Sequence, residues 1–281
     1  MNYAFEAYRL KNRIGSVVMP KRVAKSAMKL FLAPKRFEIK DWEKEAEKKG
    51  ERISLRHDLS AIRWSPESEK KTSNNKQILL VHGWESRATQ MYGLVKEIIE
   101  QGYTVIAVDM PGHGHSKGQT SNAFIFAQTV QYMQEKLGHF YAVIGHSMGA
   151  GATAIAVGKG LEADKLVLIS GPSSIENVLK RFSGFVGLNR HASELFVTFI
   201  GKHVGVPASE LDATELLQGC NIPTLIIHDE LDIEMPISES KRLAPAFNQV
   251  ELFITQGFGH RKILKADEVI LKISSFLSNA A

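Results

Sequence analysis

The chain has 281 residues, 44% of them hydrophobic and 23% charged, so it can bury a large core without cross-links. Its single cysteine excludes an intrachain disulfide. The net charge of +5 comes from the first 36 residues, which hold nine Lys or Arg and one acid, and no nucleic-acid module is recognisable. We therefore expect no nucleic-acid partner. No run approaches the roughly 18 apolar residues of a membrane span, and no secretion signal is evident, so we expect a cytoplasmic protein.

The basic leader, residues 1–36, has a partly amphipathic helical pattern in which Val23, Ala27, Leu30 and Phe31 fall at helical spacing. One interpretation is weak adsorption on an anionic membrane surface. The other, which we favour, is a helix packed on the main domain or near the active site. A charge-rich helical stretch follows at 41–49. Together these segments predict a basic N-terminal helical extension over residues 1–50.

Strand-like runs then dominate the chain. Those at 52–57 and 59–64 predict the antiparallel opening of a sheet, and a polar loop is expected at 65–75. Short apolar runs follow at 77–81, 103–108, 141–144, 166–169 and 224–227, with a weaker, half-polar run at 250–254. Helical patterns lie between them. This alternation predicts an α/β fold whose mostly parallel sheet is covered by helices on both faces.

The alternation breaks after residue 169. Residues 172–218 contain helix-like segments, such as 174–182 and 193–199, but no buried-strand run. We interpret them as a small helical cap over the carboxyl edge of the sheet, where open α/β sheets bind ligands. The core domain is then 51–171 together with 219–281.

A candidate nucleophile lies at Gly145-His-Ser-Met-Gly149, between a strand at 140–144 and a helix at 150–159. This is the strand–turn–helix context of a nucleophile elbow. Such a turn strains the backbone of Ser147 and projects its hydroxyl above the sheet. Glycines are needed two residues to either side because larger side chains would clash there.

A serine hydroxyl needs a base to accept its proton, and of the ten histidines only His260 follows the last strand-like run. His191 and His203 lie in the insertion and are expected to be surface or lid residues. His146, beside the nucleophile, is expected to pack around the elbow.

The acid that orients the base should follow the run at 224–227. Four acids compete there: Asp229, Glu230, Asp232 and Glu234. We favour Asp232, because it is far enough past the strand to lie on a loop that Pro236 ends, and Asp229 is the second choice.

The developing oxyanion needs two backbone donors. The N–H of Met148, directly after the nucleophile, is one candidate. The N–H of Trp84, in the loop after 77–81, is the other, and Gly83 would let that loop turn inward.

These segments, together with Val81-His-Gly-Trp84, Asp109–Ser116 and Gly257-Phe-Gly-His260, resemble in order the motifs of α/β-hydrolase-fold serine hydrolases, in their esterase and lysophospholipase-like branch. The resemblance covers about residues 52–279. It implies an eight-stranded mostly parallel sheet, a lid and no cofactor. It also implies the triad Ser147, Asp232 and His260, with Trp84 and Met148 as oxyanion donors. The family usually has Gly where Asp229 stands. Asp109 is expected to serve loop architecture, and no metal site is expected.

The expected activity is carboxylesterase-like hydrolysis of a small or medium apolar ester through an acyl-enzyme on Ser147. The apolar-ester expectation rests on Leu195, Phe196, Phe199 and Ile200 of the insertion, which would equally suit the core of a cap. Thioester, amide or C–C bond cleavage, perhydrolysis and a membrane-surface lipid hydrolase are alternatives on the same triad. A non-catalytic ligand-binding protein is a remote one. The partner is then a small molecule, and the oligomeric state is left open.

Overall fold

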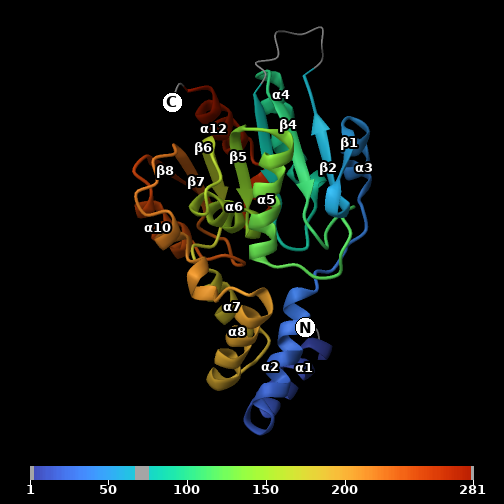
Figure 1. Cartoon of the computed structure of the whole chain (residues 1–281), viewed down its shortest axis with the longest axis vertical. Coiled ribbons are helices and arrows are strands. Elements are labelled where there is room, and N and C mark those ends of the chain that lie inside the picture. The colour runs from blue at the N-terminus through green and yellow to red at the C-terminus, as the bar shows by residue number, and fades with distance from the viewer. Residues whose placement is uncertain (1–2, 67–75, 280–281) are drawn as a thin grey trace.

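A computed structural model describes residues 3–66 and 76–279. Its centre is one sheet of eight strands in the order β1-β2-β4-β3-β5-β6-β7-β8 (Figure 1). The strands are β1 (Glu51–Leu55), β2 (Leu59–Trp64), β3 (Gln77–Val81), β4 (Thr104–Asp109), β5 (Phe140–His146), β6 (Ala163–Ile169), β7 (Thr224–Asp229) and β8 (Val250–Thr255). Only the β1–β2 and β2–β4 pairings are antiparallel. The predicted mostly parallel sheet is confirmed, whereas most of the loop predicted at 65–75 lies outside the described residues.

Helices cover both faces of the sheet, as predicted. One buried cluster joins the sheet to α5 (Ala123–Leu137) and α6 (Met148–Gly158). The other joins its opposite face to η2 (Ala88–Leu94), α4 (Val95–Glu100) and α12 (Asp267–Ser278). Strand side chains alternate between the two clusters, as period-two geometry requires.

The remaining elements are shorter or lie at the ends of the sheet. They are α1 (Tyr3–Val18), α2 (Pro20–Leu32), α3 (Asp41–Lys48), η1 (Arg56–Asp58), α7 (Ile175–Phe185), α8 (Arg190–Val204), η3 (Ala208–Leu211), α9 (Ala213–Leu216), α10 (Ser238–Leu243), η4 (Ala244–Ala246), α11 (Gly259–Lys262) and η5 (Ile263–Lys265). Within the described residues, no helix is long and apolar enough to cross a membrane.

The position of β3 determines where a site can form. Its neighbours are β4 on one side and β5 on the other, so the strand order reverses there. The loops after β3 and β5 therefore diverge at the carboxyl edge, which is where open α/β sheets leave a ligand crevice. The elbow at Ser147 and the Gly83-Trp84 turn follow these two strands.

Four helices, α1, α2, α7 and α8, project together from the carboxyl edge of the sheet (Figure 1). The N-terminal segment thus packs on the insertion: Phe31 of α2 contacts the rings of Phe182 and Phe196 at centroid distances of 5.0 and 5.9 Å. The Asn12 side chain donates 2.7 Å to the carbonyl of Val186. In the structure α2 is thus a packed helix whose partner is the insertion, although Leu30 of its predicted apolar face is 41% exposed.

Candidate active site

Ser147 is in the backbone conformation expected of an elbow. It joins β5 to α6 at φ 54° and ψ −124°, a region that costs a non-glycine residue of order 1–3 kcal/mol. The glycines are needed sterically. A Cβ on Gly149 would lie 2.2 Å from the carbonyl oxygen of Val81, and one on Gly145 would lie 2.6 Å from the Cα of Ala150.

The three residues predicted as a triad lie together. The Ser147 Oγ is 2.8 Å from His260 Nε2, and His260 Nδ1 is 2.7 Å from Asp232 Oδ2. Both Asp232 and His260 are buried, whereas Ser147 is half-buried. A carboxylate on Nδ1 fixes the imidazole with Nδ1 protonated, which leaves Nε2 as the acceptor for the serine proton.

Asp232 is held in place by its own loop. Its Oδ1 accepts the backbone N–H groups of Glu234 and Met235 at 2.9 and 2.8 Å, which leaves Oδ2 for His260. Burial by itself raises the pKa of this carboxyl. The hydrogen bonds from His260 and from the Met235 N–H outweigh burial, so the pKa lies below its ordinary value. Asp232 is therefore ionised near neutral pH.

Asp229, the competing acid, has different neighbours. Its carboxylate accepts the Thr255 hydroxyl at 2.8 Å and the backbone N–H groups of Leu231, Gly257 and Phe258 at 3.0, 3.3 and 3.0 Å. It thus ties the end of β7 to the loop that carries His260. The extra acid that departs from the family pattern is a brace for this loop.

His146 supports His260 from the elbow. Its Nε2 donates 2.7 Å to the backbone carbonyl of His260. Burial, reinforced by the proximity of His260, lowers the pKa of His146 to about 3. It is therefore a neutral hydrogen-bond donor, which refines the expectation that it packs around the elbow.

The loop after β3 approaches Ser147 closely. A Cβ on Gly83 would lie 2.9 Å from the Cβ of Ser147, so only glycine allows this approach. Among the described residues, no hydrogen bond uses the backbone N–H of Trp84 or of Met148. The Trp84 ring stacks on Phe31 at 5.9 Å and meets His113 edge-on at 5.0 Å. Trp84 therefore connects the N-terminal helices to the loop beside Ser147.

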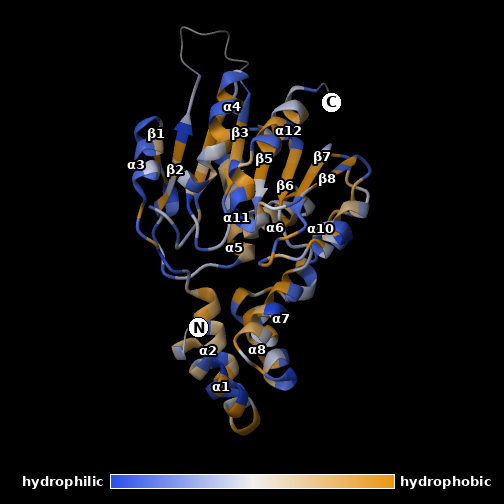
Figure 2. Cartoon of the chain, turned by 180° about the vertical axis from the view of Figure 1, so that it is seen from behind, coloured by the Kyte–Doolittle hydropathy of each residue, from blue (hydrophilic) through white to orange (hydrophobic). Residues whose placement is uncertain are grey.

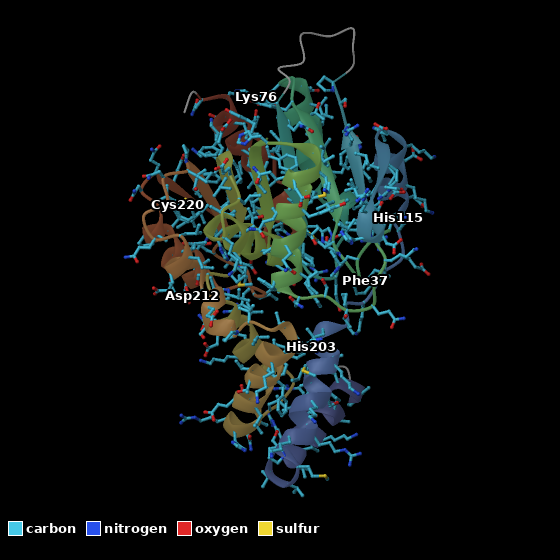
Figure 3. The ribbon with its side chains drawn as sticks, viewed as in Figure 1. Phe37, Lys76, His115, His203, Asp212 and Cys220 are labelled. Carbon is cyan, nitrogen blue, oxygen red and sulfur yellow. The ribbon has the colours of Figure 1, made fainter. Side chains whose placement is uncertain are left out.

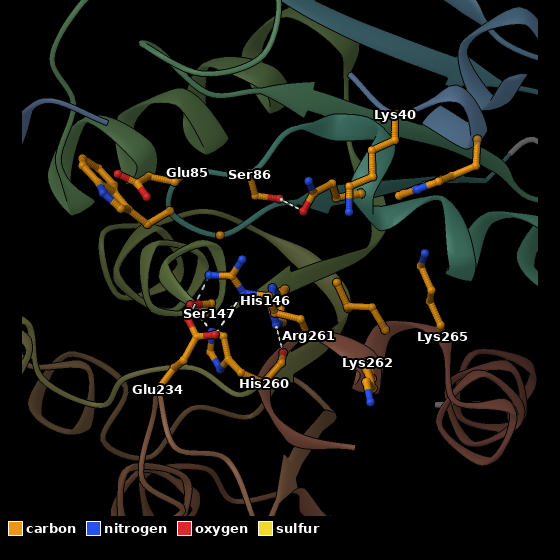
Figure 4. Close-up of a pocket in the computed structure, with 15 residues that line it drawn as sticks. Lys40, Glu85, Ser86, His146, Ser147, Glu234, His260, Arg261, Lys262 and Lys265 are labelled. Carbon is orange, nitrogen blue, oxygen red and sulfur yellow. Dashed lines mark hydrogen bonds and ion pairs between the residues drawn. The ribbon is translucent and has the colours of Figure 1, made fainter. Parts of the chain in front are cut away.

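A cavity of about 370 Å³ opens beside Ser147 and His260. Its lining is strongly charged and contains Lys40, Trp42, Gly83, Trp84, Glu85, Ser86, Gln90, His146, Ser147, Glu234, His260, Arg261, Lys262, Leu264 and Lys265 (Figure 4). No residue of the insertion is among them. Phe196 and Ile200 of the insertion are instead buried in the cluster that includes Phe31.

Other residues that the sequence highlighted lie elsewhere. His191 and His203 are exposed on α8, and Figure 3 shows His203 among the projecting helices. Asp109 is buried and accepts the N–H groups of Ala88 and His115 at 2.8 and 3.1 Å. This matches its expected place in loop architecture.

The charged part of the lining was not predicted from the sequence. Lys40 and Trp42 come from the N-terminal extension, and Lys265 follows the histidine loop. Lys265 Nζ lies 3.9 Å from the centroid of the Trp42 ring, although more than 200 positions separate the two residues in sequence. Only the folded arrangement brings these residues together.

Comparison with known proteins agrees with this architecture. A family model described as the alpha/beta hydrolase fold matches residues 76–191. A non-heme haloperoxidase from Rhodococcus erythropolis is 26% identical over 75% of this chain and 95% of its own length. A serine hydrolase-like protein from Dictyostelium discoideum is 27% identical, but the match covers only 38% of this chain and 31% of that protein.

Solved structures show the same fold. An esterase from Pyrococcus furiosus superposes with a TM-score of 0.62 at 20% identity, covering 88% of this chain and 98% of that one. A bromoperoxidase from Bacillus anthracis gives a TM-score of 0.60 at 19% identity, covering 82% of this chain and 100% of that one. The eight-stranded sheet, the family match through β3 to β6 and the solved structures together show that this chain has the α/β-hydrolase fold.

Proposed function

We propose that this protein is a serine hydrolase that cleaves a carboxylic ester through an acyl-enzyme on Ser147. His260 is the general base, Asp232 orients it, and the N–H groups of Trp84 and Met148 stabilise the oxyanion. One observation carries the proposal: an unbroken chain of short hydrogen bonds runs from Ser147 Oγ through His260 to Asp232. Only an aligned base makes a serine hydroxyl a competent nucleophile.

The reaction follows from these positions. Ser147 Oγ attacks the ester carbonyl while its proton passes to His260 Nε2, and Asp232 stabilises the resulting imidazolium. The tetrahedral oxyanion lies against the two backbone donors. Its collapse expels the alkoxide, which takes the proton from His260. Water then attacks the acyl-enzyme with His260 again as base, which releases the acid and restores Ser147.

The alternative reactions differ from ester hydrolysis in the bond that is cleaved or in the attacking species. Thioesters, amides, C–C bonds and perhydrolysis would use the same three side chains, and two of the relatives above carry peroxidase names. The small or medium apolar ester stays a prediction, but its basis is weaker because the insertion's apolar side chains do not line the cavity. The cytoplasmic location and the division into core and cap also stay predictions.

A fluorophosphonate probe tests the mechanism, because it reacts only with activated serines. We expect labelling at Ser147 and none in Ser147→Ala. Asp232→Asn should lower kcat by about 10³- to 10⁴-fold, by analogy with triad acids. The matched variant Asp229→Asn should mainly lower stability, by about 1–3 kcal/mol, because its buried donors lose a charged acceptor. Labelling that persists in Ser147→Ala, or a larger kcat loss in Asp229→Asn, would overturn the assignment.

A second candidate function, hydrolysis at a lipid surface, is favoured by the outer face of α1. Large apolar side chains repeat there at helical spacing and are more than half exposed, from 57% for Leu10 to 83% for Tyr3. They are Tyr3, Leu10, Ile14, Val17 and Val18, and Figure 2 shows hydrophobic colouring at this end of the molecule. Soluble monomers seldom expose such a stripe.

The surrounding charge favours an anionic membrane over a second copy of the chain. Nine basic residues and one acid lie within the first 36 positions. Two such segments would repel each other, whereas each cation near an anionic lipid surface contributes about 1 kcal/mol. An apolar stripe beside basic residues is the pattern of helices that lie in a membrane interface.

Vesicle sedimentation tests this candidate. We expect binding to vesicles containing phosphatidylglycerol and about 10- to 100-fold weaker binding when Leu10, Ile14 and Val17 are all replaced by Gln. Leu271→Gln on α12, where Leu271 is 60% exposed, is the matched control and should bind as the wild type does. Equal sedimentation of the triple variant, or a dimer that depends on this stripe, would argue against a membrane partner.

A further inference from the structure

The cavity beside Ser147 has an excess of positive charge. Its lining includes four cations, Lys40, Arg261, Lys262 and Lys265, and two carboxylates, Glu85 and Glu234, which leaves a net charge of 4 − 2 = +2. A cleft lined by one sign of charge attracts ligands of the opposite sign and raises their local concentration. The excess therefore bears on which substrates reach the nucleophile.

The two carboxylates are already engaged. Glu234 forms a bidentate pair with Arg261 at 2.9 and 3.2 Å. Glu85 Oε1 accepts the backbone N–H of Lys35 at 3.1 Å. Neither carboxylate binds a lysine of the lining. Within the described part of the chain, the side chains of Lys40, Lys262 and Lys265 form no ion pair with any other carboxylate either. The free charge of the cavity is thus carried by ammonium groups.

These ammonium groups lie apart from the reacting atoms. In Figure 4, Lys40 and Lys265 stand on the opposite side of the cavity from Ser147 and His260, whereas Lys262 extends away at its rim. Lys265 is oriented by its contact with the Trp42 ring at 3.9 Å. A group held by Lys40 and Lys265 would therefore lie some way from an ester carbonyl positioned at Ser147.

We propose that Lys40 and Lys265 form a subsite for a carboxylate, so that the preferred substrate is an ester that bears a second, ionised carboxyl group. This inference rests on the proposed esterase function and specifies its substrate class. Trp42 and Leu264, which also line the cavity, provide apolar surface for the part of the substrate that joins the two groups.

A carboxylate fits this subsite better than a phosphate. Lysine binds phosphate as a point charge, but phosphate sites commonly add the bidentate fork of an arginine or a cluster of backbone N–H groups. The only arginine of the lining is paired with Glu234. The two separate ammonium groups lie in a cavity whose net charge is only +2, and this matches a substrate group that carries a single negative charge. A single negative charge on the substrate is enough for such a site to distinguish a charged ester from a neutral one.

Paired substrates test the subsite. The measured quantity is the ratio of kcat/KM for 4-nitrophenyl hydrogen glutarate to that for neutral 4-nitrophenyl valerate. A second pair, 4-carboxyphenyl and 4-carbamoylphenyl butyrate, places the charge on the alcohol side. We expect a preference of about 5- to 10-fold for the charged member of at least one pair, since exposed charge pairs are each worth a few-fold in affinity. Salt should reduce the preference.

The double variant Lys40→Gln/Lys265→Gln should abolish the preference and act mainly through KM, because the carboxylate contacts ground state and transition state alike. Lys96→Gln on α4, whose lysine is 82% exposed outside the cavity, is the matched control and should retain the ratio. Hydrolysis of all four esters without a charge preference, or a preference that survives in the double variant, would refute the subsite alone. Failure to turn over any ester, with no fluorophosphonate labelling, would instead refute the proposed function.

Discussion

The strain at Ser147 links stability to activity at the scale of a single residue. Its φ of 54° is unfavourable for any side chain with a Cβ, and glycine relieves it. We predict that Ser147→Gly unfolds at a higher temperature than Ser147→Ala, with a difference of about 1 kcal/mol in unfolding free energy. Both variants lack the nucleophile, so thermal denaturation compares the backbone effect alone. Equal melting temperatures would mean that the turn stores no strain.

Site residues differ in how far sequence could predict them. Ser147 and Asp232 follow buried strands and His260 follows the half-exposed β8, in a fixed chain order, so local pattern and chain order were enough to predict them. The bracing role of Asp229 was not predictable, because its partners Thr255 and Phe258 come from the next strand and loop. The charged lining was missed for the same reason: lysines carry no periodic signal that places them at a cavity.

Among the elements, α2 makes the contact that joins the N-terminal segment to the rest of the fold. Phe31 is 9% exposed and lies among the rings of Trp84, Phe182 and Phe196. We predict that Phe31→Ala lowers the unfolding free energy by about 3–5 kcal/mol, the usual cost of emptying a buried aromatic site. Phe37→Ala, at a side chain 54% exposed, should change it by less than about 0.5 kcal/mol. Urea denaturation of both variants checks the difference. A similar small effect in each would show that α1 and α2 are only loosely docked.

The same contact should affect function, since Phe31 stacks on Trp84 beside the nucleophile. We expect Phe31→Ala to lower kcat more than it raises KM for a neutral ester, because a displaced Trp84 N–H weakens oxyanion stabilisation. Steady-state kinetics well below the unfolding transition separate this effect from lost stability. Unchanged kcat in folded Phe31→Ala would contradict the coupling.

Strands were easier to predict than helices. β3 was expected at the residues where it occurs, because buried parallel strands are continuous apolar runs bounded by polar residues. The helical pattern expected between the runs at 77–81 and 103–108 instead begins as the 3₁₀ segment η2 and becomes α-helical only at α4. This segment also packs tightly on a distant part of the chain, which local pattern does not report: a Cβ on Gly93 would lie 2.5 Å from the carbonyl oxygen of Leu264.

The molecule as a whole should lose stability in mild acid because several buried histidines are neutral. Burial lowers the pKa of His82 and His228, and lowers those of His113 and His146 to about 3. An unfolded histidine titrates near 6.5, so the unfolded chain binds more protons between about pH 6.5 and 3. This stability is fully present above pH 6.5 and is lost as the pH falls toward the folded values. Each histidine contributes up to about 1.4 kcal/mol per pH unit.

Urea denaturation between pH 7 and pH 5 measures this dependence. We expect the unfolding free energy to fall with pH in the wild type and to fall less steeply in His146→Gln, which keeps an N–H donor but does not titrate. His191→Gln, an exposed position on α8, should retain the wild-type slope. A flat profile in the wild type would contradict the buried neutral histidines.

The packing of α2 against α8 also has a consequence for synthesis on the ribosome. Phe31 emerges early, but its ring partner Phe196 is translated 165 residues later. Since synthesis proceeds at about 5–20 residues per second, Phe196 is added roughly 8 to 30 s after Phe31. Throughout that interval the ring of Phe31 lacks the side of its pocket that Phe196 provides. Within this chain, the docking of α2 is therefore completed only after the insertion has been made.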